Sequence, residues 1–255
     1  MARPPDRDGC GRALLRPLIE VVEETASTNA DLSRRLGAGE GLAEGFWLRA
    51  VRQSAGRGRR GRQWSSPEGN LYASTVVQLR AYDPPVHSLA FVAALAVYDL
   101  MLSQLPREAD CQLKWPNDVL VDGAKICGIL LERAGDHVII GIGVNVVSAP
   151  DLPDRATISI RAANPDSDND AQTVLERLAD GLAVRLAQWR REGLPSTLAD
   201  WTRHAHPQGT PLLVTLDEEG LLPGAFAGLD PDGALRLRLA DGSLRVVHAG
   251  DVSLA

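Results

Sequence analysis

The feature of this 255-residue chain that most constrains its fold is an arginine- and glycine-rich stretch enclosed by two strand-like runs. Residues 46–51 and 71–79 have the apolar or alternating pattern of β-strands. Between them, the sequence RQSAGRGRRGRQW contains no acidic residue and carries Arg52, Arg57, Arg59, Arg60 and Arg62. We therefore expect a sheet in which one long loop presents a local positive charge suited to an anion.

The composition of this loop is typical of a segment that closes over a small anionic ligand. Gly56, Gly58 and Gly61 give backbone freedom and allow a close approach of the chain. The interleaved arginines can hold a carboxylate or a phosphate through paired, charge-assisted hydrogen bonds. Taken alone, the same segment also fits a solvated basic turn or an arginine–glycine segment that binds RNA. The loop predicts an anion, and other segments must decide which one.

The rest of the first 206 residues predicts a mixed α/β unit around a central sheet. Ser27, Thr28 and Asn29 offer capping side chains for a helix that stops at Gly37. Residues 86–105 carry apolar side chains at helical spacing, which predicts a largely buried helix, and helices after residue 170 are expected to cover the sheet. Further strands are expected at 18–24, 112–114, 119–121, 126–132 and 137–147.

After Pro207 the pattern changes to short strands separated by DPDG and DG turns. These strands are expected at 211–216, 224–229, 234–239 and 244–248. A β-unit of this size is marginal alone, so we expect it to pack on the larger unit. The predicted organisation is a flexible arm over residues 1–17, a large domain over 18–206 and a small C-terminal domain over 207–255.

Charge and cysteine content narrow the class of protein. A net charge of −6 gives no electrostatic reason to expect general nucleic-acid binding. Cys10, Cys111 and Cys127 are odd in number and lack metal-ligand spacing, which indicates a reducing compartment. No run approaches the roughly 18–20 apolar residues of a membrane span, and the N-terminus lacks a signal peptide's apolar segment. We expect a cytoplasmic protein that binds neither DNA nor a membrane.

Five sequence blocks together resemble the biotin protein ligases. They are STN at 27–29, GRGRRGRQW at 56–64, LKWPND at 113–118, KICGILLE at 125–132 and GIGVN at 141–145, and the segment HAGDVSL resembles the end of that family's small domain. The resemblance implies an α/β (α+β) catalytic domain with a mixed central sheet, the fold shared by biotin and lipoyl ligases and class II aminoacyl-tRNA synthetases. It also implies a small C-terminal SH3-like β-barrel. With little sequence ahead of residue 18, the chain is similar to the monofunctional type that has no DNA-binding domain.

The resemblance further implies a reaction and a site. Family members activate biotin with ATP as biotinyl-AMP, with Mg²⁺ bridging the phosphates, and transfer it to a lysine of a biotin carboxyl carrier domain of acetyl-CoA carboxylase or another biotin-dependent carboxylase. The residues that match the family's biotin site are Ser27, Thr28, Asn29, Gln53, Gly56, Arg57, Gly58, Arg59, Lys125 and Gly128. Those that match its ATP site are Arg60, Arg62, Trp64, Lys114, Asn117 and Asn145. The resemblance assigns the catalytic roles to Arg59, Lys125 and Asp118.

The chemistry of these side chains agrees with that reaction. The neutral ureido ring of biotin needs donors and an acceptor, which the hydroxyls and amide of residues 27–29 can supply. Its carboxylate is a poor electrophile, so transfer to an amine requires activation as a mixed anhydride with AMP. Lys125 is expected to offset the charge that develops on phosphate, Arg59 to retain the adenylate, and Asp118 to help deprotonate the incoming amine.

Simpler interpretations remain open from the sequence. Ser27 can be an N-cap alone, KWPND a turn with a buried indole, and Trp64 a core tryptophan. GIGVN lacks the third glycine of a dinucleotide fingerprint and no Walker A sequence is present, so ATP would be bound without a P-loop. The rival functions are a nucleic-acid-binding protein and a lipoate ligase. The family also forms homodimers, and the oligomeric state stays open, as does the choice between Lys114 and Lys125 as the main lysine of adenylation.

Overall fold

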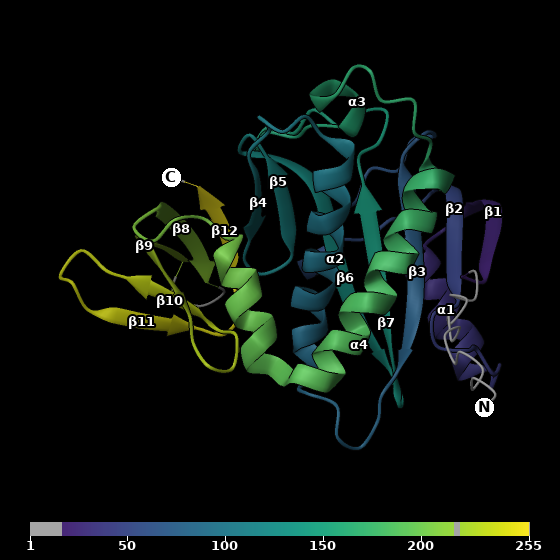
Figure 1. Cartoon of the computed structure of the whole chain (residues 1–255), viewed down its shortest axis with the longest axis horizontal. Helices are drawn as coiled ribbons and strands as arrows, with labels where there is room; N and C mark the ends of the chain where they lie inside the picture. Colours follow the sequence, from purple (N-terminus) through teal and green to yellow (C-terminus); the bar gives the residue numbers. More distant parts are fainter. Residues whose placement is uncertain (1–16, 217–219, 255) are drawn as a thin grey trace, which may run out of the picture.

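The computed structural model describes residues 17–216 and 220–254, which form a seven-stranded mixed sheet and a five-stranded antiparallel sheet (Figure 1). The large sheet has the order β1-β2-β3-β7-β6-β5-β4. Its strands are β1 (Ile19–Thr25), β2 (Trp47–Gln53), β3 (Leu71–Gln78), β4 (Cys111–Lys114), β5 (Asp118–Val121), β6 (Ala124–Ala134) and β7 (His137–Val144). Apart from Pro17, the arm predicted over 1–17 lies outside the described residues, as does Cys10.

The one parallel pair of the large sheet, within the described ranges, is β1 with β2, and it is joined by α1 (Thr28–Gly37). A parallel pair requires a crossover, which this helix provides. Ser27 is the N-cap of α1: its backbone is extended and its side chain accepts from the N–H of Ala30. The strand, cap and helix predicted from the sequence are therefore confirmed, and they bring residues 27–29 against the sheet.

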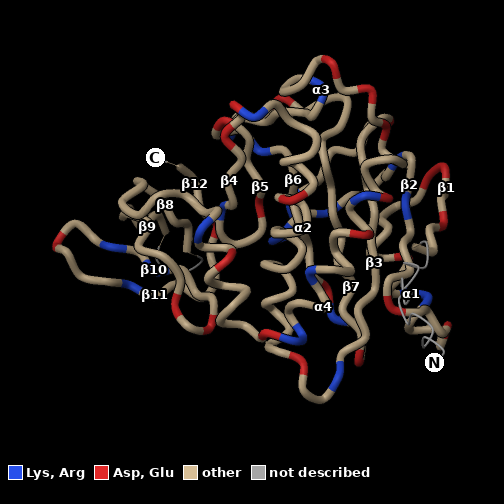
Figure 2. The backbone as a smooth tube through the Cα atoms, viewed as in Figure 1, with Lys and Arg blue, Asp and Glu red and all other residues tan. Residues whose placement is uncertain are grey.

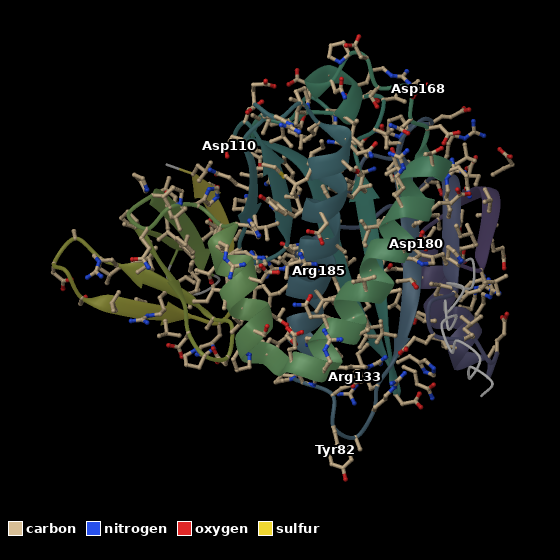
Figure 3. All side chains as sticks on the ribbon, in the orientation of Figure 1. Tyr82, Asp110, Arg133, Asp168, Asp180 and Arg185 are labelled. Atoms are coloured by element: carbon tan, nitrogen blue, oxygen red, sulfur yellow. The ribbon has the colours of Figure 1, made fainter. Side chains whose placement is uncertain are left out.

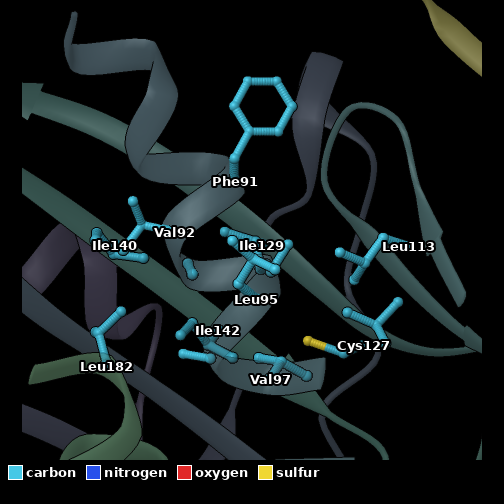
Figure 4. Packing of buried hydrophobic residues seen from close by; sticks show 14 of the residues in the cluster. Phe91, Val92, Leu95, Val97, Leu113, Cys127, Ile129, Ile140, Ile142 and Leu182 are labelled. Carbon is cyan, nitrogen blue, oxygen red and sulfur yellow. The ribbon is translucent and has the colours of Figure 1, made fainter. Parts of the chain in front are cut away.

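The two faces of the large sheet differ because side chains alternate along each strand. On β7, Ile140, Ile142 and Val144 point into the main core, where they pack against α2 (Leu89–Gln104) (Figure 4). Gly141 and Gly143 point to the other face, on which α1 lies over β3 and β7. One face of the sheet thus carries the main core. The other carries a smaller cluster under α1, and its glycines let Asn29 and Trp64 lie directly on β7.

Helix α2 is the most apolar helix of the described chain. By length and composition alone, residues Val86–Gln104 could cross a membrane, which the sequence analysis did not anticipate. However, 11 of the 16 residues of α2 are buried against the sheet and α4. Continuous burial explains the apolar composition, so we assign α2 as a core helix.

Helix α4 (Ala171–Arg203) lies beside α2 and leads from the large sheet to the small one (Figure 1). It bends at Gly193, whose φ of 79° is not helical. Arg185, which lies between the two helices (Figure 3), donates to Asp99 of α2 at 2.6 Å and to Asp200, beyond the bend, at 2.5 Å. This ion-pair cluster fixes both halves of α4 against α2. A short helix, α3 (Ile160–Ala163), lies between β7 and α4, where the sequence analysis predicted no helix.

The small sheet has the order β11-β10-β9-β8-β12. Its strands are β8 (Pro211–Leu216), β9 (Gly220–Leu229), β10 (Leu235–Arg238), β11 (Leu244–Val247) and β12 (Asp251–Leu254). The sequence analysis predicted four of them and missed β12, which pairs with β8. The buried side chains of this sheet join the same core cluster as those of the large sheet, so the small unit packs on the larger one as expected.

Candidate active site

A cavity of about 470 Å³ lies on the glycine face of the large sheet, within the usual size range of small-molecule sites. Its walls come from the start of α1, the arginine–glycine loop, β6, β7 and a loop over residues 150–157. The predicted site residues that line it are Ser27, Thr28, Asn29, Gln53, Arg57, Gly58, Arg59, Arg62, Trp64, Asn117, Lys125, Gly128 and Asn145. The fold therefore brings together segments that lie more than 100 residues apart in the sequence.

One end of the cavity is neutral and hydrogen-bonding. The Thr28 N–H donates to Gln53 Oε1 at 2.9 Å, and the Thr28 hydroxyl bonds Ser74 Oγ at 2.6 Å. Ser74 in turn donates to Asn29 Oδ1 at 2.6 Å, while Asn29 Nδ2 donates to Glu132 at 2.6 Å. The network holds each amide in one orientation, so its donors and acceptors are preorganised for a polar, uncharged ring.

The glycines of the strands are required by close contacts in this region. A Cβ at Gly128 would lie 2.8 Å from Cζ3 of Trp64, and a Cβ at Gly143 would lie 2.6 Å from Cε2 of the same ring. The indole therefore lies directly on the backbone of β6 and β7. Its buried Nε1 has no hydrogen-bond partner among the described residues, which leaves a donor at the cavity wall.

The arginine–glycine loop forms an irregular hairpin. Gly58 N donates to Arg62 O at 2.7 Å, Trp64 N donates to Gly56 O at 2.9 Å, and the turn between them has positive φ at Arg60 (56°) and Gly61 (72°). At the base of the hairpin, a Cβ at Gly56 would lie 2.7 Å from the Trp64 carbonyl oxygen. Gly56 is buried in this base and does not line the cavity, so its role there is close packing of the loop.

The tip of the loop reaches the small sheet. Arg59 donates to Gly250 O at 3.3 Å and to Asn117 Oδ1 at 3.5 Å, and Arg62 donates to Asp251 Oδ1 at 2.7 Å. Arg60 donates to Thr215 O at 3.4 Å, is exposed, and does not line the cavity. The loop is therefore held over the cavity by carbonyl and carboxylate groups of the C-terminal unit, and Arg60 belongs to that contact.

A buried charge cluster lies beneath the cationic end of the cavity. Asp118 accepts from Lys125 at 2.6 Å and from Lys114 at 3.1 Å. Burial alone would raise the pKa of Asp118, but the ammonium groups of Lys125 and Lys114 hold it below its usual value. Burial lowers the pKa of Lys114, which also donates to Val252 O at 2.9 Å. Lys125 lines the cavity, whereas Lys114 and Asp118 lie behind it.

Both asparagines of the predicted ATP site donate hydrogen bonds to backbone carbonyl groups. Asn145 Nδ2 donates to Ile158 O at 3.1 Å and to Lys125 O at 3.4 Å, and Asn117 Nδ2 donates to Ile129 O at 2.5 Å. Asn145 thus joins the strand that carries Lys125 to Ile158, the residue that directly follows the loop over 150–157. Contact of Asn145 with an adenine edge stays a prediction.

Glu132 and Arg155 are two of the residues at the site that were not found from the sequence. Glu132 lies in the KICGILLE block, but its bond to Asn29 depends on the register of β6 against α1. Arg155 lies in an aperiodic loop and lines the cavity. Its neighbours in the sequence do not indicate a site. Its position at the cavity depends on backbone hydrogen bonds between the loop and β6, which sequence spacing does not reveal.

Residues 25–145 match the model of the Biotin/lipoate A/B protein ligase family, and residues 213–255 match that of the Biotin protein ligase C terminal domain. A biotin–[acetyl-CoA-carboxylase] ligase of Paracoccus denitrificans is 34% identical over 244 residues, which are 91% of this chain and 98% of that protein. The chain belongs to the biotin/lipoate A/B protein ligase family. In this chain, all five sequence blocks contribute walls to one cavity: STN, GRGRRGRQW, LKWPND through Asn117, KICGILLE and GIGVN.

Solved structures of family members have the same fold. The biotin protein ligase of Aquifex aeolicus in complex with biotin and ATP superposes with a TM-score of 0.79 at 26% identity, over 93% of this chain and 98% of that one. The Leishmania major enzyme in complex with biotinyl-5-AMP gives 0.64 at 28% identity, over 91% and 99%. The prediction of a mixed-sheet ligase domain with a small antiparallel β-domain is confirmed.

Proposed function

We propose that this chain activates biotin with ATP as biotinyl-AMP and transfers the biotinyl group to a lysine of a biotin carboxyl carrier domain. The observation that carries the proposal is a single cavity with a neutral, hydrogen-bonding end and a cationic end. This polarity matches biotin, which has a ureido ring at one end and a carboxylate at the other. Family membership and the names of its relatives give the same reaction.

We assign the ureido ring to the neutral end and the carboxylate to the cationic end. Thr28, Asn29 and Gln53 then face the ring, with Ser27 at the helix start beside them. Arg57, Arg59 and Lys125 face the carboxylate and the α-phosphate of ATP. Of the other predicted ATP contacts, Arg62, Trp64, Asn117 and Asn145 line the cavity and would face the nucleotide, whereas Arg60 and Lys114 do not line it.

In the first step, a carboxylate oxygen of biotin attacks the α-phosphorus of ATP, and pyrophosphate leaves with the electrons of the broken P–O bond. Lys125 is placed to offset the charge on the phosphate oxygens. In the second step, the ε-amine of the acceptor lysine attacks the acyl carbon, AMP leaves and the amine loses a proton. Lys125 and Lys114 hold the pKa of Asp118 below its usual value, which makes its carboxylate a weak base. The carboxylate also accepts from Lys125 at 2.6 Å. We therefore assign Asp118 to orienting Lys125 instead of removing that proton.

Magnesium fits this site as part of the nucleotide substrate. The described residues contain no group of three His, Cys, Asp or Glu side chains that could hold a metal. The nearby carboxylates of Asp118 and Asp154 are paired with Lys125 and Arg155. Magnesium in such sites is commonly held by substrate phosphates and water with few protein carboxylates. Mg²⁺ would therefore enter with ATP and neutralise phosphate charge there.

A lipoate ligase is the rival within the family, because the matched family model covers both activities. The match of residues 213–255 to the biotin ligase C-terminal domain favours biotin. A nucleic-acid-binding protein is the other rival. Basic and acidic residues are interspersed over the molecule in the view of Figure 2. Three arginines of the basic loop contact the C-terminal unit instead of forming an open surface.

The domain division and compartment belong to the same proposal. We place the catalytic domain at 18–206 and the small β-domain at 207–255. Free thiols at Cys111 and Cys127 support a reducing compartment such as the cytoplasm. An acceptor from acetyl-CoA carboxylase is supported by the name of the Paracoccus relative. Dimerisation would follow the family and is open to direct measurement of mass in solution.

The proposal is tested with the purified chain, Mg²⁺, ATP labelled in the α-phosphate and either biotin or lipoate. We expect labelled biotinyl-AMP with biotin and, after addition of a biotin carrier domain, its consumption with biotinylation of one lysine. A carrier whose acceptor lysine is replaced by arginine is the control and should stay unmodified. Adenylate formation with lipoate alone would assign the chain to the lipoate branch, and none with either acid would refute the proposed activity.

A further inference from the structure

Arg155 is a cationic wall residue of the cavity that the reaction described above does not use. It lies on the loop Pro150–Thr157, the main part of which also lines a shallow surface groove beside the cavity. Its side chain is 24% exposed and pairs with Asp154, whose own side chain is 57% exposed. Arg155 is therefore at the mouth of the cavity, where the cavity meets solvent, and its partner is a surface carboxylate.

The loop is fixed to the strand that carries Lys125. Lys125 N donates to Ala156 O at 2.9 Å, and Ile158 N donates to Lys125 O at 3.1 Å. These two bonds bracket Thr157, which forms a parallel bridge with Lys125. Because Arg155 lies one residue before this ladder, its backbone position is coupled to that of Lys125. A ligand group bound to Lys125 at one end can extend to Arg155 at the mouth.

Charged side chains surround Arg155 at this end of the cavity. Its guanidinium lies within electrostatic range of the carboxylates of Asp118 and Asp251 and of the ammonium group of Lys114. Arg62 acts on the paired Asp154 from the arginine–glycine loop. Arg155 and Arg62 both line the cavity, one from the loop over 150–157 and one from the arginine–glycine loop.

We propose that Arg155 binds the β- and γ-phosphates of ATP, and hence the pyrophosphate leaving group, by exchanging Asp154 for phosphate oxygens. The inference rests on the proposed function, which places biotin's carboxylate and the α-phosphate at Lys125. The neutral end of the cavity is occupied by the ureido ring, so the two outer phosphates extend toward the mouth. A planar guanidinium suits two phosphate oxygens, and a mouth position allows pyrophosphate to leave while the adenylate stays inside.

The test separates the two half-reactions, because pyrophosphate takes part only in the first. Arg155→Gln should raise the KM for Mg·ATP roughly 10-fold to 100-fold, the range expected for losing charge-assisted hydrogen bonds. The inhibition constant of inorganic pyrophosphate should rise in parallel. Transfer from supplied biotinyl-AMP to the carrier domain, and the Kd for biotin, should stay within twofold of wild type. Arg155→Lys, which keeps the charge, should restore part of the ATP affinity.

Asp154→Asn on the same loop is the matched control. It removes the competing carboxylate and leaves the guanidinium, so the KM for Mg·ATP should stay equal or fall. A rise as large as that of Arg155→Gln would show that the ion pair itself maintains the loop and would overturn the proposal. Slower transfer from supplied biotinyl-AMP in Arg155→Gln would overturn it as well, because that step contains no pyrophosphate.

Calorimetric titration of magnesium pyrophosphate separates this inference from the proposed function. The titration needs no turnover, so it reports on Arg155 even where wild-type protein forms no adenylate. Weaker binding by Arg155→Gln supports the phosphate role, and equal binding by wild type and variant overturns it. Equal thermal unfolding midpoints of the proteins confirm that the comparison is between folded chains.

Discussion

Lys114 and Lys125 share the carboxylate of Asp118 but face different parts of the molecule. Lys125 lines the cavity, while Lys114 donates to Val252 O of β12 and lies behind it. The burial that lowers the pKa of Lys114 also shields it from substrate. The geometry therefore favours Lys125: we expect Lys125 to act in adenylation, and Lys114 to position Asp118 and the end of the chain.

We expect Lys125→Met to lower the rate of biotinyl-AMP formation about 10²- to 10³-fold, the usual cost of losing one charge-stabilising donor. Single-turnover formation of labelled biotinyl-AMP measures it. Lys114→Met is the control. It should lower the unfolding midpoint, and it should reduce the adenylation rate less than Lys125→Met does. The assignment would be reversed if Lys114→Met abolished adenylation while Lys125→Met left it within threefold of wild type.

Arg59 connects the loop to both units, through Asn117 of the large unit and Gly250 of the small one. In Arg59→Gly both contacts are lost, so the loop should open more often while Lys125 remains in place. We expect adenylate to form at a near-normal rate but to escape and label bystander lysines, seen as biotin on added serum albumin. Arg80→Gly, at an exposed arginine outside the cavity, should label the carrier alone. Retention of the adenylate by Arg59→Gly would contradict this role.

At the scale of elements, regular strands and helices were predictable and their irregular connections were not. The hydrophobic periodicity of the sequence predicts the strands β2 and β3 and the helix α2. The Asp122–Gly123 pair predicts a turn, and the structure has positive φ there, at 50° and 77°. Strand β12 has only four residues near the chain end, and its structure depends on pairing with β8. No local pattern encodes such pairing, so the sequence could not predict it.

The same distinction applies to the site. Sequence blocks predicted the residues of the cavity walls, since each block lies on or beside one regular element. Which of them face the ligand depends on tertiary contacts: Arg60 points to Thr215, and Lys114 lies behind Asp118. Arg155 reaches the wall through backbone bonds to Lys125, 30 residues earlier in the sequence. Sequence spacing contains no information on those contacts.

Strand β12 begins at the residue that fastens the arginine–glycine loop. Asp251 accepts from Arg62 at 2.7 Å and lies 3.9 Å from Arg60. Because these side chains are partly exposed, Asp251→Asn should increase the dissociation rate of biotinyl-AMP only about two- to fivefold, in line with a pair worth up to 1 kcal/mol. A filter-binding chase with unlabelled biotin and ATP measures that rate.

The matched control for Asp251→Asn is Glu68→Gln. Glu68 pairs with Arg52 of β2 at 3.8 Å, with both side chains mostly exposed. Glu68→Gln also removes one negative charge from an ion pair, but this pair does not reach the C-terminal unit. The dissociation rate of biotinyl-AMP should therefore be unchanged. Equal rates for Asp251→Asn and wild type would show that the loop is retained without this contact.

At the scale of the whole molecule, one hydrophobic core spans both sheets. Phe91 at the start of α2 packs edge-on against Trp201 of α4, with ring centroids 5.4 Å apart. A Cβ at Gly233 of the small unit would lie 2.7 Å from the Phe91 ring, and Trp115 donates to Gly233 O at 3.1 Å. The two units therefore share packing atoms, and we expect them to unfold in one transition despite their separate sheets.

Phe91→Ala tests this coupling because Phe91 is 3% exposed and contacts both units. The variant should lose about 3–5 kcal/mol of unfolding free energy, the usual cost of truncating a buried phenylalanine. Leu102→Ala on the same helix, at 60% exposure, should lose less than about 0.5 kcal/mol. Urea unfolding followed by fluorescence and circular dichroism should give coincident curves for wild type. Separate transitions would show that the C-terminal unit folds by itself, and its hold on the arginine–glycine loop would then be independent of the core.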